Sequence, residues 1–163
     1  AKTGGNYAAG LKAHKKAQEL NYNQVLWLDA LDGKFIEEAG TMNIFFVYKN
    51  GEIVTPSLNG SILDGITRKS ILTLARDAGM VVQERKISIK EVISDIQSHA
   101  ITEAFGTGTA ASLLSIGKIG YQNKDFIIGG EKIGPVSKKL KKTLNDIQYG
   151  ITQDTYNWTV EVV

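Results

Sequence analysis

The sequence contains no cysteine, only two prolines and no long uninterrupted apolar run. The lack of cysteine excludes disulfides, cysteine nucleophiles and metal sites built from thiolates. It is also compatible with a reducing compartment, and we expect a cytoplasmic protein. Because no apolar run approaches the roughly 18 residues that a membrane-spanning helix needs, no membrane contact is predicted. The few prolines and the lack of low-complexity tracts argue against disorder.

Neither sign of charge is in great excess. The chain has 19 basic and 17 acidic residues, a net charge of +2, which gives no electrostatic reason to expect a nucleic-acid partner. His14 and His99 have no partner at ligand spacing, so we expect no metal site. What is present is an ordinary globular composition, 42% hydrophobic and 22% charged, in 163 residues that suit one domain.

Helical and strand periods alternate along the chain, with hairpin signals between them. Asn50 and Gly51 give a strong hairpin signal, Ser88 and Glu91 form a capping box, and Pro135 opens a last helix. A tight glycine–threonine turn is expected after Phe105. The expected helices span residues 7–20, 64–78, 89–98 and 135–149, and the expected strands span 25–29, 42–48, 52–57, 80–87, 101–105, 111–119 and 125–128. This order predicts a mixed α/β domain rather than a purely parallel one.

Four short segments stand out from this scaffold: 2–7 (KTGGNY), 37–43 (EEAGTMN), 58–68 (LNGSILDGITR) and 105–111 (FGTGTAA). A lysine amine can form a Schiff base with an aldehyde, and a carboxylate can pair with a protonated ring nitrogen. A helix that opens on glycine and threonine, or a glycine–threonine turn, can bind a phosphate or a carboxylate. Taken singly, each segment also fits a bland interpretation: a surface lysine, solvated glutamates, an ordinary helix start capped by Asp64, and a plain turn.

In this order and spacing, the four segments resemble the signatures of branched-chain-amino-acid aminotransferases, and the likeness covers nearly the whole chain, including residues 24–28 and 146–150. The resemblance implies a pyridoxal 5'-phosphate enzyme of fold type IV. Residues 1–163 would then be the large, C-terminal, cofactor-binding domain of D-amino-acid-aminotransferase-like enzymes, an α/β mixed-sheet pseudo-barrel with flanking helices. The small N-terminal domain would be absent. The start on Ala1, one residue before the richest motif, also leads us to expect a fragment.

The resemblance implies roles for single residues. Lys2 would be the catalytic residue, which holds the cofactor as a Schiff base and later moves a proton. Tyr7 would hydrogen-bond the phenolic oxygen of the cofactor, and Glu38 would pair with its pyridine nitrogen. The phosphate would be held by Gly65, Ile66, Thr67 and Thr109. The substrate would lie against Thr41, Thr109 and Ala110.

The implied reaction is transamination between leucine, isoleucine or valine and 2-oxoglutarate, so amino acids and 2-oxo acids would be the partners. The parent protein would be a homodimer or larger, and the fragment by itself would have low or no activity. Two alternatives stay open. One is a D-amino-acid aminotransferase or aminodeoxychorismate lyase of the same fold, and the other is a non-catalytic truncated domain.

Overall fold

The fold is described from a computed structural model that covers residues 4–131, 133–160 and 162. Lys2 therefore lies outside the described residues. The helices are α1 (Gly4–Ala8), α2 (Leu11–Glu19), α3 (Ile66–Asp77), α4 (Ile89–Gln97) and α5 (Pro135–Gln148), with a 3-10 turn η1 (Gly129–Glu131). The strands are β1 (Leu26–Leu28), β2 (Ile36–Ala39), β3 (Met42–Tyr48), β4 (Ile53–Pro56), β5 (Val82–Arg85), β6 (Ile101–Gly108), β7 (Ser112–Ser115), β8 (Lys118–Tyr121) and β9 (Lys124–Ile127).

Strand β3 is the centre of a seven-stranded sheet. Its one edge pairs antiparallel with β6, which also pairs with β7. Its other edge pairs with β2 at the start of the strand and with β4 at the end. Strands β1 and β5 extend the sheet beyond β2 and β4, and only the β4–β5 pair is parallel. The α/β class and the mixed sheet with flanking helices are confirmed. The described strands pair as an open, branched sheet with a separate β8–β9 hairpin, and they form no closed ring.

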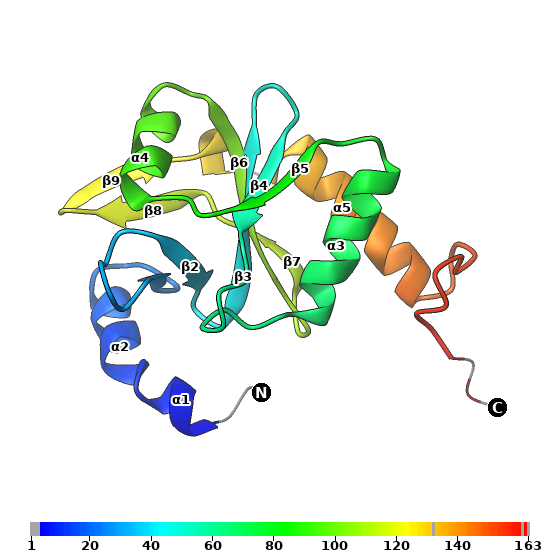
Figure 1. The fold of residues 1–163 in the computed structure, drawn as a ribbon, viewed down its shortest axis with the longest axis horizontal. Helices are drawn as coiled ribbons and strands as arrows, with labels where there is room; N and C mark the ends of the chain where they lie inside the picture. Colours follow the sequence, from blue (N-terminus) through cyan, green and yellow to red (C-terminus); the bar gives the residue numbers. More distant parts are fainter. Residues whose placement is uncertain (1–3, 132, 161, 163) are drawn as a thin grey trace.

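Helices cover both faces of this sheet, as Figure 1 shows: α3 and α5 lie on one face, and α4 with the β8–β9 hairpin on the other. Strand β3 supplies both layers because successive side chains point to opposite faces. Phe45 packs on the α3–α5 side, where its ring stacks on that of Phe105 at 5.0 Å, and Phe46 packs on the α4 side. Burial on both faces explains why β3 is an almost continuous apolar run. None of the described helices is long and apolar enough to cross a membrane.

Several local predictions are confirmed. The chain reverses at Asn50–Gly51 between β3 and β4, and α5 begins at Pro135. Ser88 caps α4 by accepting a hydrogen bond from the backbone N–H of Glu91 at 3.1 Å. The Glu91 side chain pairs with Arg85 at 2.6 Å.

Other predictions are wrong. The helix expected over 7–20 is interrupted at residues 9–10, between α1 and α2. Gly10 lies in this break, and a Cβ there would be 3.0 Å from the ring of Trp27. The glycine–threonine segment is not a turn up to residue 108: it continues β6 and pairs with both β3 and β7, and the chain turns only at residues 109–111. The strand expected over 111–119 is divided into β7 and β8. Strand β2 was not predicted, because its two glutamates hide the strand pattern.

Candidate active site

A cavity of about 970 Å³ opens between the first two helices, the strands β1 and β2, and the loop before α3. Tyr7 and His14 line it from the helices. Glu38 and Thr41 line it from β2 and the β2–β3 turn, and Asp64 from the loop. The structure thus brings three of the predicted segments to one place, although their residues are far apart in the sequence.

A row of side chains crosses the sheet at the floor of this region. The strand register pairs Trp27 with Glu38, Glu38 with Asn43, and Asn43 with Thr107. Directly paired residues on neighbouring strands point to the same face, so these side chains stand side by side. Trp27 also donates a hydrogen bond from its indole nitrogen to the carbonyl of Gly40 at 3.0 Å, which fixes the β2–β3 turn. Sheet pairing therefore sets the direction in which Glu38 points.

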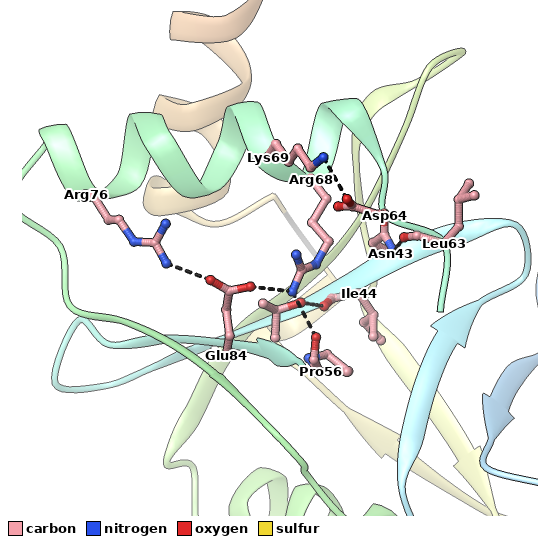
Figure 2. Close-up of polar contacts among 10 residues, drawn as sticks. Asn43, Ile44, Pro56, Leu63, Asp64, Arg68, Lys69, Arg76 and Glu84 are labelled. Atoms are coloured by element: carbon pink, nitrogen blue, oxygen red, sulfur yellow. Dashed lines mark hydrogen bonds and ion pairs between the residues drawn. The ribbon is translucent and has the colours of Figure 1, made fainter. Parts of the chain in front are cut away.

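The loop over residues 58–65 is tied to this row by hydrogen bonds. The backbone N–H of Leu63 donates to Glu38 Oε1 at 3.1 Å, and the Asn43 side-chain amide donates to the Leu63 carbonyl at 2.8 Å. Figure 2 shows the second of these bonds. Glu37 holds the same loop further out, since Asn59 donates to it at 3.0 Å and the hydroxyl of Ser61 also donates to it. The two glutamates are partly exposed, and both anchor the loop.

The N-terminus of α3 faces this loop without a side-chain cap among the described residues. Gly65 is the N-cap residue, with extended backbone angles (φ −69°, ψ 134°). Asp64, the cap expected from the sequence, forms an ion pair with Lys69 at 2.6 Å instead. Gly65 is required by close packing, because a Cβ at this position would overlap Asn43 Oδ1. The first-turn amides therefore keep their capacity to bind an anion, which the helix dipole favours.

Tyr7 approaches the carboxylate of Glu38 from the helical side. Burial, and secondly the negative charge of Glu38, raise the pKa of the Tyr7 phenol above its usual value of 10.0. The phenol is therefore protonated at neutral pH and can donate a hydrogen bond. A phenol and a carboxylate at one cavity can together orient a ligand. The ligand would accept a hydrogen bond from the phenol at one atom and share a proton with the carboxylate at another.

The remaining predicted site residues that the structure describes do not line the cavity. Ile66, which is 77% exposed, and Thr67 form the first turn of α3 and do not themselves line the cavity. Thr109 and Ala110 occupy the exposed β6–β7 turn, also outside the lining. Because Thr107 pairs with Asn43, this turn follows directly from the row that carries Glu38. Lys2 lies outside the described residues.

Sequence reasoning missed Asn43 as the link between the sheet and the loop. It is 5% exposed and stands within the apolar run of β3, and a polar amide at such a position needs a partner in the fold. That signal could have marked it. Thr107 gave no comparable signal: its hydroxyl is buried and meets no hydrogen-bond partner in the part of the chain that the structure describes.

The arrangement indicates a class of protein: an α/β domain with a ligand-sized cavity lined by Tyr7 and Glu38, next to a helix start at α3 that has no side-chain cap among the described residues. Comparison with known proteins gives the family. The sequence model of amino-transferase class IV matches residues 1–119, and the chain belongs to this family.

Relatives and solved structures agree on one type of enzyme. The chain is 54% identical, over 99% of its length, to branched-chain-amino-acid transaminase 1 of Bacillus subtilis, and spans 45% of that protein. The Escherichia coli branched-chain amino acid aminotransferase superposes with a TM-score of 0.82 at 30% identity, covering 97% of this chain and 49% of that one. The Thermobaculum terrenum enzyme, solved in its PLP-form, superposes with a TM-score of 0.78 at 29% identity, covering 91% and 45%. The chain thus spans about half the length of these proteins.

Proposed function

We propose that the full-length protein containing this chain catalyses pyridoxal 5'-phosphate-dependent transamination of leucine, isoleucine and valine with 2-oxoglutarate. The observation that carries this proposal is the 54% identity to a Bacillus branched-chain transaminase over 99% of the chain. The PLP-form of the Thermobaculum terrenum enzyme supports the choice of cofactor. We further propose that residues 1–163 form its large, cofactor-binding domain, and that the protein acts in the cytoplasm as a homodimer or larger assembly.

The described residues fit this cofactor. An anionic phosphate needs a cradle of donors, and the first turn of α3 after Gly65 has no side-chain cap to compete for its amides. We assign phosphate binding to Gly65, Ile66, Thr67 and Thr109. Glu38 Oε1 accepts one hydrogen bond from Leu63, and a carboxylate has further acceptor capacity for a ring N–H. When bound, the cofactor supplies an electron sink for charge that develops on the substrate carbon.

Each polar residue then has one task. Glu38 would keep a proton on the pyridine nitrogen of the cofactor, and Tyr7 would donate a hydrogen bond to its phenolic oxygen. Lys2 would hold the cofactor covalently and, once its amine is free, would move the proton at the substrate carbon. Thr41 and the turn at Thr109 and Ala110 lie against the substrate, with backbone amides near its carboxylate.

The test uses the full-length protein and the variant Lys2→Ala. We expect the wild type to show the near-ultraviolet absorbance of a Schiff base with pyridoxal phosphate and to convert leucine, while Lys2→Ala loses both. Lys12→Ala, an exposed lysine on α2, is the matched control and should keep both. A normal cofactor spectrum in Lys2→Ala would remove the lysine from this role.

A second assay separates the branched-chain enzyme from its sister enzymes. With 2-oxoglutarate as acceptor, we expect turnover of leucine, isoleucine and valine and no turnover of D-alanine. A preference for D-alanine would identify a D-amino-acid aminotransferase, and formation of an aromatic product from aminodeoxychorismate would identify the lyase.

The 163-residue chain by itself should have low or no activity. The Bacillus relative is more than twice as long as the matched region, so further cavity walls can come from the rest of such a protein. Activity of the isolated chain equal to that of the full-length protein would contradict this expectation.

A further inference from the structure

Arg68 is a buried cation in the turn that we assign to the phosphate. It follows Thr67 directly in the first turn of α3, and its side chain is only 2% exposed. Figure 2 shows its guanidinium reaching to the end of β4 and to β5. There the Nη2 atom donates to the Pro56 carbonyl at 3.0 Å and to Glu84 Oε2 at 2.8 Å. The side chain therefore ties the start of the helix to the adjacent parallel strands.

The same carboxylate has a second arginine partner. Arg76, at the other end of α3, donates to Glu84 Oε1 at 2.7 Å, and its side chain is 51% exposed. Burial alone would raise the pKa of Glu84, but hydrogen bonds and charges from Arg76 and Arg68 hold it below its usual value. Glu84 thus stays charged and has two arginine partners, the buried Arg68 and the exposed Arg76.

Stability alone does not explain the buried ion pair between Arg68 and Glu84. Desolvation of a buried ion pair offsets much of the Coulomb attraction. In addition, Arg68 Nε is buried and makes no hydrogen bond within the described ranges, which is destabilising. An apolar side chain of similar length would avoid both costs. Such a side chain could not make the directed hydrogen bonds that join the first turn of α3 to β4 and β5.

Asn43 holds the other side of the same turn. Its amide binds the Leu63 carbonyl at 2.8 Å, and its Oδ1 lies where a Cβ of Gly65 would be. The turn is therefore held on one side by the row across the sheet and on the other by Arg68. Amides that converge on one anion must be placed to within a fraction of an ångström to act together.

We propose that Arg68 is a positioning residue for anion binding: clamped by Pro56 and Glu84, it holds the first turn of α3 where its amides converge on the phosphate. The inference rests on the proposed function, because it takes that turn as the phosphate site. Arg68 itself does not contact the anion. Its guanidinium forms an ion pair with Glu84, and it acts on the anion only by positioning the backbone of the turn.

The experiment compares two ligands that differ only in the phosphate. Apo full-length protein is titrated with pyridoxal 5'-phosphate and, separately, with pyridoxal, and binding is followed by absorbance. The ratio of the two dissociation constants measures what the phosphate site contributes. In Arg68→Met and in Glu84→Gln, we expect pyridoxal phosphate to bind about tenfold more weakly while pyridoxal binding stays the same.

Two further variants show what the effect depends on. Arg76→Met removes the exposed arginine partner of Glu84 and should leave the ratio of the two dissociation constants unchanged. Arg68→Lys keeps the charge but loses the planar fork, and should also lower phosphate selectivity. If Arg68→Lys binds both ligands like the wild type, charge and not position is responsible, and the proposal is overturned. Glu84→Gln and Arg68→Lys carry the test if Arg68→Met does not fold.

Failure of the clamp and failure of the site are distinguishable. Thr67→Ala lies within the assigned phosphate turn, so it should weaken pyridoxal phosphate and spare pyridoxal. An unchanged ratio in the Arg68 and Glu84 variants with a changed ratio in Thr67→Ala overturns the clamp alone. An unchanged ratio in Thr67→Ala and in the Arg68 and Glu84 variants together overturns the phosphate assignment and the clamp with it. Equal weakening of both ligands in the Arg68 variants would make Arg68 a general structural residue.

Discussion

The two walls of the cavity differ in how they are held. The wall made by β2 and the loop over 58–65, which leads into α3, is fixed by side chains that cross between elements, such as Asn43 to Leu63 and Arg68 to Glu84. The wall made by α1 and α2 has few such links. No described residue of α2 is buried, and the helix pair is anchored chiefly where Gly10 meets the ring of Trp27 and where Tyr22 donates to Asp125.

This difference between the walls suggests that they contribute to ligand binding in different ways. The wall that we propose to bind the anion is held by contacts within the chain, so its geometry should exist before any ligand arrives. In the other wall, no described residue of α2 is buried, and few buried contacts are the usual property of a segment that orders or moves on binding. The following experiments test this comparison, from the largest expected effect to the smallest.

Hydrogen exchange measures the contrast directly. We expect amides of α2 to exchange through local opening at about 1–2 kcal/mol, while those of α3 and β3 exchange only on global unfolding, several kcal/mol higher. The measurement is native-state exchange followed by mass spectrometry or NMR. Equal protection of α2 and α3 would remove the distinction between the walls.

Gly65→Ala should damage the preassembled wall. Its Cβ would overlap Asn43 Oδ1, so we expect a loss of about 3 kcal/mol in the free energy of unfolding. Gly5→Ala on α1 is the matched control, because no described atom lies within 4 Å of its Cβ position, and its stability should stay near that of the wild type. Denaturant unfolding gives both values. A Gly65→Ala protein as stable as the control would mean that Asn43 and the turn are not tightly packed.

Asn43→Ala should cost somewhat less, about 2 kcal/mol, because the Leu63 carbonyl loses its buried donor. It also removes the atom that a Cβ at Gly65 would overlap. The double variant with Gly65→Ala should therefore cost less than the sum of the two single changes. Strict additivity in a denaturant-based double-mutant cycle would contradict the contact between these residues.

Asp29→Asn tests the loop that leads into β2, and its effect should be the smallest. The backbone N–H groups of Phe35, Asp32 and Lys34 donate to Asp29 and lower its pKa from 3.8 to about 2. A depressed native pKa stabilises the fold above the unfolded value, and this contribution disappears as the pH falls from about 4 toward 2. Wild type should be slightly more stable than Asp29→Asn at pH 7 and equal to it near pH 2. A difference that does not change with pH would exclude the charge as its cause.

Much of the scaffold follows from local patterns. The apolar run of β3, the Asn50–Gly51 reversal, the Ser88 cap and the Pro135 helix start are each determined by residues close together in the sequence. Strand β2 and the extension of β6 to Gly108 were not predictable in the same way. Strand β2 depends on pairing with β3, and the extension of β6 depends on pairing with β3 and β7, which overrides the weak strand preference of glutamate and glycine.

For the site, the segments themselves were recognisable and their surroundings were not. Glu38 and the Gly65–Thr67 helix start were identified from sequence, but the bonds that orient them, from Leu63, Asn43 and Arg68, join residues distant in the chain. The expected cap at Asp64 was wrong because Lys69 takes that carboxylate, which leaves the helix end uncapped among the described residues.

The sequence by itself therefore determined most of the helices and strands and the short motifs that the chain carries, because backbone preferences and side-chain periodicity act over a few residues. Only the tertiary structure decided that β2 and β6 flank β3, that Glu38, Asn43 and Thr107 form one row, and that Arg68 clamps the start of α3. The physical reason is that strand pairing and buried polar contacts are chosen by packing and by the need to satisfy buried groups, which no local pattern specifies.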